Sequence, residues 1–291
     1  MRILACLAVA LALSCGGALP PGSDGATGSG VAASDLRVAA PRATVVLIHG
    51  LGGFKHISRV DYFFGVPDLY RSLGATVVIP GSSALATVEQ RAGELKAQLD
   101  QVPGPLVLIA HSQGGLDARY LVSRLGYKSR VRAVVTIATP HHGTPVADVV
   151  AGLVPSPVRV GVNELLEPLG WSVDEAWEMT TRNMETRFNV DVPDVPGVTY
   201  WSYSGRATPF GLGRDEGVLH ATLLAGWTLI DAFHQPNDGV VPEASAHWGT
   251  FQGRLTADHF TEVNQPVGIH RGFDAIGFYR ALLGKLHDQG F

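Results

Sequence analysis

The chain has 291 residues, of which 46% are hydrophobic and 16% are charged. This composition excludes an intrinsically disordered protein, which has few hydrophobic residues and many charges. With 22 Lys and Arg against 26 Asp and Glu, the formal net charge is −4. A mildly acidic chain without a basic run is not typical of a protein that binds nucleic acid.

The first 15 residues have the features of a signal peptide. Arg2 precedes an apolar stretch from Ile3 to Leu13, which is too short to span a bilayer and is typical of the apolar region of a secretory leader. The two cysteines of the chain, Cys6 and Cys15, both lie in this leader. We therefore expect an exported protein whose folded domain has neither a disulfide nor cysteine chemistry.

Cys15 allows two interpretations of the leader. The segment from Ala12 to Gly16 resembles a bacterial lipobox, in which cleavage occurs just before a lipid-modified cysteine. The alternative is an ordinary secretory leader cleaved near Ala18, which gives a secreted protein. Residues 16–41 are rich in Gly, Ser and Ala and predict a flexible linker. The folded domain is expected over residues 42–291.

The domain alternates between apolar runs and helical patterns. Apolar runs that continue without alternation are typical of strands buried on both faces, and strand–helix–strand alternation predicts a mostly parallel sheet with helices on both faces. Thr87 and Gln90 form a capping box at the start of one helix. We expect strands at 43–48, 75–79, 105–110, 131–138 and 198–203, and helices at 87–101, 116–125 and 273–287.

A candidate nucleophile follows the third expected strand directly. Ser112 lies in the sequence Ala110-His111-Ser112-Gln113-Gly114-Gly115, which matches the G-x-S-x-G elbow with alanine at the first glycine position. A sharp turn from strand to helix exposes its central serine at the carboxyl end of the sheet and requires small neighbours. The alternative is a chance turn of small residues, but the expected strand and helix supply the required context.

A serine hydroxyl needs a base, and the base needs a carboxylate to orient it. In this type of fold the chain order is Ser, then Asp or Glu, then His. Ser112, Asp238 and His259 follow this order. Rival residues for these roles are Asp231, His247, Asp258 and His270, while His56, His220, His234 and His287 are interpreted as surface or packing residues.

The tetrahedral intermediate of acyl transfer requires backbone N–H donors for its oxyanion. Gln113 follows the nucleophile and is expected to provide one donor. The glycine-rich loop after the first strand, His49-Gly50-Leu51-Gly52-Gly53, is expected to provide the other through Leu51.

From about residue 45 to the C-terminus the chain resembles the bacterial triacylglycerol lipases of the Pseudomonas–Burkholderia type, which have the α/β-hydrolase fold. The motifs that carry this resemblance are 49–53, 60–67, 111–115, 139–143, 187–189, 200–205, 237–239, His259 and 262–265. The resemblance implies Ser112 as nucleophile, Asp238 as carboxylate, His259 as base, and Leu51 and Gln113 as oxyanion donors.

The resemblance also implies a structural calcium site near the catalytic histidine, and here the sequence departs from the family. Asp215 would supply one carboxylate, and Gln265 and Ile269 would supply backbone carbonyls. Thr261 stands where the family has the second aspartate. Losing one carboxylate weakens a calcium site, so we expect a weak or lost site and no required cofactor. The pair His141-His142 is interpreted without a metal.

The alternation breaks between residues 145 and 188, where apolar residues are interrupted by Pro155, Pro157, Pro168 and Gly170. A broken amphipathic insertion over the carboxyl ends of the strands is typical of a lid that opens at a lipid–water interface. The alternative is an ordinary packing subdomain of hydrophobic helices.

These features predict a secreted or lipid-anchored serine carboxylester hydrolase that acts on acylglycerols. An esterase, phospholipase, thioesterase or polyester hydrolase would use the same triad. A catalytically silent hydrolase fold used as a binding module is the alternative from another class, and the intact Ser–Asp–His set argues against it. The sequence does not decide whether folding requires a dedicated chaperone.

Overall fold

The computed structural model describes residues 38–53, 56–57, 60–153, 173–211, 216–266, 268 and 272–291. The expected signal peptide, and with it Cys15, lies outside the described residues, as do residues 16–37 of the expected linker and residues 154–172 of the expected lid.

A six-stranded sheet forms the centre of the domain, in the order β10-β7-β6-β5-β1-β4, and all neighbouring strands pair in parallel. Parallel pairing follows from the helices that connect successive strands. The strands are β1 (Thr44–Ile48), β4 (Val77–Val78), β5 (Leu106–His111), β6 (Val131–Ile137), β7 (Thr199–Gly205) and β10 (Thr250–Leu255).

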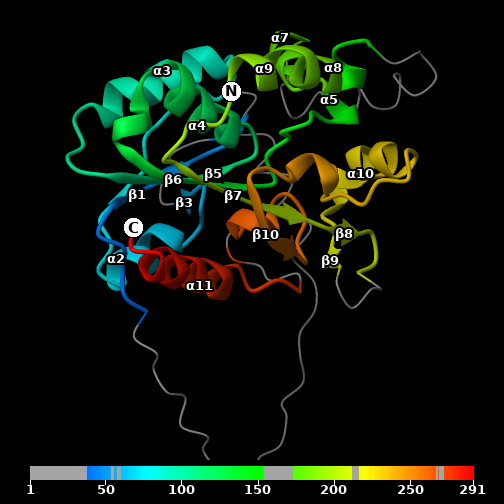
Figure 1. Cartoon of the computed structure of the whole chain (residues 1–291). Coiled ribbons are helices and arrows are strands. Elements are labelled where there is room, and N and C mark those ends of the chain that lie inside the picture. The colour runs from blue at the N-terminus through cyan, green and yellow to red at the C-terminus, as the bar shows by residue number, and fades with distance from the viewer. Residues whose placement is uncertain are drawn as a thin grey trace, which may run out of the picture.

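Helices cover both faces of this sheet (Figure 1). Successive side chains of a strand point to opposite faces, so Leu47 and Ile109 join one core cluster while Ile48 and Leu108 join the other. The first cluster lies between the sheet and the helices α2 (Val66–Ser72) and α11 (Ala275–Asp288). The second lies between the sheet and the helices α3 (Val88–Leu99) and α4 (Gln113–Arg124). Burial on both faces explains why the strands are continuous apolar runs.

Short helices and two small ribbons complete the described part of the fold. Above the sheet in Figure 1 lie α5 (Pro145–Val150), α7 (Val173–Glu178), α8 (Thr181–Asn183), η3 (Met184–Phe188) and α9 (Asn189–Asp191). The ribbons are β2 (His56–Ile57) with β3 (Val60–Asp61), and β8 (Ala207–Thr208) with β9 (Gly217–Val218). The remaining elements are α10 (Leu224–Asp231), η1 (Tyr127–Ser129), η4 (Ala221–Leu223), η5 (Ala244–Ala246) and η6 (Thr261–Val263).

The observed architecture confirms the α/β fold class that the sequence predicts. The expected strands and helices are present, although the run at 75–79 forms only the two-residue strand Val77–Val78. Strand β10 was not predicted, because Gly253 and two polar residues, Gln252 and Arg254, interrupt its apolar pattern. No helix among the described residues combines the length and apolar character needed to cross a bilayer.

The two ends of the domain meet beside α11. Val38 and Ala40, which fall within the expected linker, pack against the core cluster that contains α11. The Arg42 N–H donates to the carbonyl of Phe291 at 2.7 Å. The folded domain therefore includes Val38, and its N-terminal end is hydrogen-bonded to Phe291.

A buried ion pair joins the two helices above the sheet. Arg91 of α3 donates through Nε to Asp117 Oδ2 of α4 at 2.7 Å, and both side chains are fully buried. Arg91 also donates to the carbonyls of Ser83 and His49. Burial raises the pKa of Asp117 to about 6, although the guanidinium beside it acts in the opposite direction. Arg91 therefore connects α4 to the loop that follows β1.

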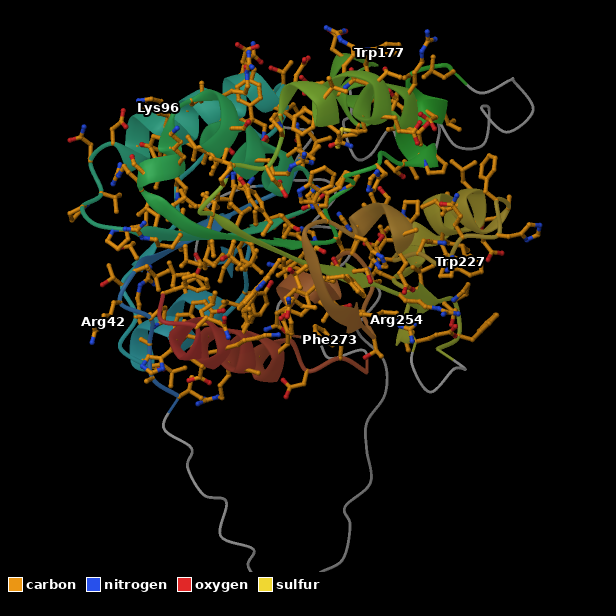
Figure 2. All side chains as sticks on the ribbon, viewed as in Figure 1. Arg42, Lys96, Trp177, Trp227, Arg254 and Phe273 are labelled. Atoms are coloured by element: carbon orange, nitrogen blue, oxygen red, sulfur yellow. The ribbon has the colours of Figure 1, made fainter. Side chains whose placement is uncertain are left out.

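We predict that Asp117→Asn destabilises the domain, because it leaves the buried Arg91 without a counter-charge. Breaking a buried pair typically costs about 3–5 kcal/mol. The matched control is Asp100→Asn, which breaks the exposed pair between Asp100 at the C-cap of α3 and Lys96, the latter labelled in Figure 2, and should cost at most about 1 kcal/mol. Urea unfolding monitored by circular dichroism measures both, and equal losses would contradict the prediction.

Candidate active site

Ser112 forms a strained turn between β5 and α4. Its φ is 56° and its ψ is −135°, a region that costs a non-glycine residue about 1–3 kcal/mol. The strand can only turn this sharply into the helix because Gly114 and Gly115 have no side chains. A Cβ on Gly114 would lie 2.6 Å from the His49 carbonyl oxygen, and one on Gly115 would lie 2.1 Å from Thr139 Oγ1.

The structure brings together the three residues that the sequence predicts as a triad. Ser112 Oγ lies 3.0 Å from His259 Nε2, and His259 Nδ1 lies 2.8 Å from Asp238 Oδ2. The three side chains come from residues that are 21 and 147 positions apart. In this arrangement the hydroxyl can donate to the imidazole, and the imidazole can donate to the carboxylate.

Asp238 is held by its own loop. Its Oδ1 accepts hydrogen bonds from the N–H groups of Val240 and Val241, at 2.8 and 2.7 Å. The His259 N–H donates to the Asp238 carbonyl at 3.0 Å. Asp238 is fully buried, and these bonds fix the orientation of its carboxylate. The same loop therefore orients both the carboxylate and the backbone of the histidine.

The glycine-rich loop after β1 lies directly against the serine. A Cβ on Gly50 would come within 2.7 Å of the Ser112 Cβ. Leu51 follows in this turn, and its side chain packs beside Leu116 and Met184. Gln113 is the first residue of α4 and is buried. Of the two expected oxyanion donors, Gln113 thus follows the nucleophile directly, and Leu51 follows the glycine that contacts it.

His49 and Arg91 fix the conformation of this loop. His49 donates through Nδ1 to the Gly50 carbonyl at 2.9 Å, and its Nε2 accepts the Ser82 N–H. Burial, and to a lesser extent the Arg91 guanidinium, lower the pKa of His49 to about 4. His49 is therefore neutral at physiological pH. The carbonyl of His49 accepts Arg91 Nη2 at 2.7 Å.

The rival residues lie elsewhere. Asp258 points away from the imidazole and accepts hydrogen bonds from its own turn. His247 stacks on Phe251, with ring centroids 3.7 Å apart. Asp231 is exposed at the end of α10, and His270 lies outside the described residues.

A second buried network, which the sequence analysis did not assign, lies behind the triad. The Tyr62 hydroxyl is hydrogen-bonded to His111 Nδ1 at 2.8 Å, and His111 Nε2 to Glu262 Oε2 at 2.9 Å. The same Glu262 oxygen lies 3.8 Å from His259 Nδ1. All three residues belong to motifs that carry the family resemblance, but no spacing in the sequence relates them. Only the fold brings them beside His259.

The pKa values of Glu262 and His111 are shifted in opposite directions, and both shifts favour the neutral form. Burial raises the pKa of Glu262 well above its usual range, and the nearby carboxylates of Asp238 and Asp258 raise it further. Burial lowers the pKa of His111, as does the neighbouring His259. Glu262 Oε1 is buried without a hydrogen-bond partner, so nothing there stabilises a negative charge.

One group of side chains in the described part of the chain has the spacing of a metal site. His111, His259 and Glu262 are the one group there with ligand atoms close enough for an ion, but the nitrogens of both rings are already engaged in the hydrogen bonds above. Of the expected calcium ligands, Asp215 and Ile269 lie outside the described residues. Gln265 lies two residues beyond η6, and its backbone N–H donates to the Phe260 carbonyl. His141 is hydrogen-bonded to Thr136 and stacks on Trp248.

The sheet, its helices and the elbow define an α/β-hydrolase fold. A Bacillus licheniformis lipase in its mature form has a similar structure, with a TM-score of 0.65 and 22% identity over 84% of this chain and 92% of that one. The sequence model described as palmitoyl protein thioesterase matches residues 44–159.

Two curated relatives are named triacylglycerol lipase. The relative from Vibrio cholerae is 31% identical over 285 residues, which cover 86% of this chain and 89% of its own. The relative from Pseudomonas fragi is 26% identical and covers 86% and 97%. The chain therefore belongs to the triacylglycerol lipase family, as the motifs in its sequence predict.

We predict that Glu262→Gln changes how stability depends on pH. An unfolded glutamate loses its proton near its ordinary pKa of 4.5, whereas burial raises the pKa of Glu262 in the folded protein, so the proton is lost there at a higher pH. The free energy of unfolding of the wild type therefore falls as pH rises above the pKa of the unfolded glutamate. The glutamine variant shows no such fall, because its side chain is neutral at every pH. The variant should become more stable relative to the wild type between about pH 5 and about pH 8.

Urea unfolding of both proteins at the two pH values measures this difference. The opposite trend would mean that Glu262 is ionised and paired with a protonated His111.

Proposed function

We propose that this carboxylester hydrolase cleaves the ester bonds of acylglycerols through an acyl-enzyme on Ser112. The observation that carries the proposal is the hydrogen-bonded series from Ser112 through His259 to the buried Asp238. The names of the relatives from Vibrio cholerae and Pseudomonas fragi support the substrate class.

In the proposed reaction, Ser112 Oγ attacks the ester carbonyl while His259 Nε2 accepts its proton. Asp238 stabilises the imidazolium that forms and holds it in the required orientation. The N–H groups of Leu51 and Gln113 are proposed to bind the oxyanion. His259 then gives the proton to the leaving alcohol, and a water activated by His259 releases the fatty acid.

The elbow supports Ser112 as the nucleophile independently of the triad distances. A strained φ at a residue that has no packing need for it is typical of functional sites. The side chain is also nearly buried, with 8% relative exposure. A buried hydroxyl beside a base is protected from competing water until a substrate brings its carbonyl into the site.

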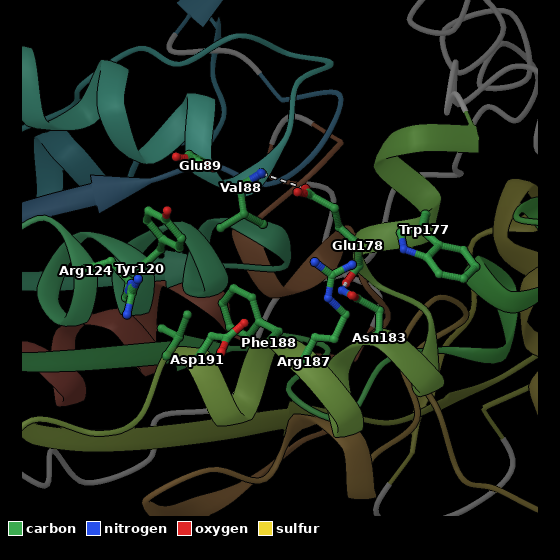
Figure 3. A pocket seen from close by; sticks show the side chains of 11 residues that line it. Val88, Glu89, Tyr120, Arg124, Trp177, Glu178, Asn183, Arg187, Phe188 and Asp191 are labelled. Atoms are coloured by element: carbon green, nitrogen blue, oxygen red, sulfur yellow. Dashed lines mark hydrogen bonds between the residues drawn. The ribbon is translucent and has the colours of Figure 1, made fainter.

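We further propose that the segment 145–188 is a lid over this site. Its described parts include Leu153 and Trp177, which are 41% and 37% exposed, and Trp177 projects from the outer side of the upper helices in Figure 2. The Val88 N–H donates to Glu178 Oε2 at 2.7 Å and connects the end of α7 to the start of α3 (Figure 3).

A pocket of about 280 Å³ lies at this junction, between α3, α4 and the helices over residues 177–192, and none of the three proposed triad residues lines it. It is therefore a feature of the contact between this segment and the rest of the domain rather than part of the active site.

Thioester hydrolysis is a second candidate, because the matching sequence model describes palmitoyl protein thioesterases. A series of p-nitrophenyl esters of increasing chain length, assayed beside emulsified triglyceride and palmitoyl thioester, separates the candidates. Hydrolysis of long-chain esters and of triglyceride supports the lipase proposal. Cleavage of the thioester alone would overturn it in favour of a thioesterase.

We predict that Ser112→Ala abolishes ester hydrolysis while the protein still folds. Loss of a triad serine typically lowers kcat by about 10⁶-fold. A fluorophosphonate probe should label the wild type and not the variant. The control Ser72→Ala removes an exposed hydroxyl that bonds only within α2 and should retain both activity and labelling. Labelling of Ser112→Ala at another serine would contradict the assignment.

We also propose that the protein is exported and that Cys15 attaches it to a membrane as a lipoprotein, with residues 16–37 as part of the tether. We predict that Cys15→Ser moves the protein from the membrane fraction to the soluble fraction, because several acyl chains together anchor stably whereas none does. Immunoblotting of the fractions measures this. A wild-type mature N-terminus beyond residue 15 would instead mean an ordinary secretory leader.

A further inference from the structure

Asp258, the residue before His259, is the centre of a dense set of hydrogen bonds. Its Oδ1 accepts the N–H groups of Phe260 and Thr261, at 3.1 and 2.8 Å, and the Thr261 hydroxyl at 2.8 Å. In return, the Asp258 N–H donates to Thr261 Oγ1 at 3.0 Å. Asp258 is fully buried and Thr261 is 4% exposed. The two side chains therefore close the turn that carries His259.

The other carboxylate oxygen connects this turn to a different part of the fold. Asp258 Oδ2 accepts the N–H of His220, which follows β9, at 2.6 Å. The His220 ring also contacts the Phe260 ring edge to face, with centroids 5.6 Å apart. Nearby, a Cβ on Gly217 of β9 would lie 2.5 Å from the Thr256 carbonyl oxygen. The turn and the segment from Gly217 to His220 are thus in close contact.

These contacts lie at the turn where the family resemblance implies one of the calcium ligands, and the described residues of this turn do not fit such an ion. Thr261 stands at the position of a ligand aspartate, and its hydroxyl is hydrogen-bonded to Asp258. The Asp258 carboxylate accepts four hydrogen bonds from N–H and O–H donors. A calcium ion requires several oxygen ligands, whereas these oxygens already take part in hydrogen bonds within the protein.

We propose that Asp258 and Thr261, with the N–H of His220, form a hydrogen-bonded clamp that positions His259 in place of a bound cation. The proposal deepens the proposed function and rests on it. The residue before His259, Asp258, is hydrogen-bonded to the segment after β9. The His259 N–H itself donates to the Asp238 carbonyl. Asp258 and Thr261 act as positioning residues, because neither touches Ser112.

The clamp fixes the imidazole relative to the serine. If the turn loosens, His259 Nε2 moves from its position 3.0 Å from Ser112 Oγ. A misplacement of about 1 Å in a catalytic group can lower the rate by about a hundredfold. A loosened clamp should therefore lower kcat more than it raises KM, because the imidazole acts on the proton rather than on substrate binding.

Two substitutions at Thr261 test the clamp. Thr261→Val keeps the shape and removes the hydroxyl, and should lower kcat by at least about tenfold, within the range expected for misplacement. Thr261→Ser keeps the hydroxyl and should remain within about twofold of the wild type, because every bond of the clamp can still form.

Asp258→Asn should also lower kcat, because an amide cannot accept from His220 and from the turn at both of its ends. The control is Asp274→Asn at the N-cap of α11, where Asp274 accepts the Gly277 N–H. It also replaces a capping aspartate but should leave kcat unchanged.

Kinetics on a soluble short-chain p-nitrophenyl ester, well below the melting temperature of each variant, separate positioning from folding. If Thr261→Val and Thr261→Ser have the same kcat when folded, the clamp does not position His259 and the proposal is overturned. The wild type should keep its melting temperature and kcat in EDTA. A loss that added Ca²⁺ restores would mean that a cation holds the turn, which would also overturn the proposal.

The labelling rate of Ser112 by a fluorophosphonate distinguishes failure of the clamp from failure of the proposed function. Labelling depends on His259 but needs no ester substrate. A protein that hydrolyses none of the esters would refute the proposed function, and the clamp would still be judged by whether Thr261→Val slows labelling by about tenfold relative to Thr261→Ser.

Discussion

The left-handed backbone of Ser112 is the constraint on which the rest of the active site depends. A φ of 56° is unfavourable for serine, so the surrounding structure must impose it. It does so from both sides, because β5 and α4 are buried in the sheet and in the helical layer above it. The turn then requires Gly114 and Gly115, which allow the helix to lie against the His49 carbonyl and Thr139. The packing of β5 and α4 in the core thereby fixes the position of the Ser112 hydroxyl.

Two carboxyl groups flank the same imidazole, and their surroundings separate their properties. Asp238 receives two backbone N–H groups and the His259 ring, so its charge is well solvated by the protein. Glu262 has a hydrogen bond from only one of its oxygens, to His111, and its pKa is raised by burial. Pairs of acids with such different surroundings commonly divide their roles in enzymes. Here Asp238 is hydrogen-bonded to the ring, while Glu262 lies 3.8 Å from the same ring nitrogen and has its pKa shifted in favour of the neutral form.

The sequence was sufficient for those parts of the protein that depend on local pattern. Continuous apolar runs predicted the parallel strands, because burial on both faces requires them, and the elbow was predicted because all of its residues lie within one short segment, 110–115. Strand β10 was missed because Gln252, Gly253 and Arg254 break its pattern and the strand lies at the sheet edge, where such residues are tolerated.

Contacts between distant residues could not be predicted in this way. Tyr62, His111 and Glu262 lie 49 and 151 residues apart, and nothing in the chain indicates that they meet. From the sequence, Asp258 was likewise no more than a rival for the carboxylate of the triad. What Asp258 does instead depends on His220, 38 residues earlier, and is visible only once the fold has brought the two together.

The meeting of the domain's ends has a consequence for the orientation of the whole enzyme. Arg42, bonded to Phe291, lies just before β1 begins, whereas Ser112 lies just after the parallel neighbour β5 ends. The two points are therefore at opposite ends of the strands, about 20 Å apart at ~3.3 Å per residue. Val38, where the described chain begins, is thus on the side of the domain away from the nucleophile. An attachment through the chain before Val38 would be made on that side and would leave the side that carries the nucleophile uncovered.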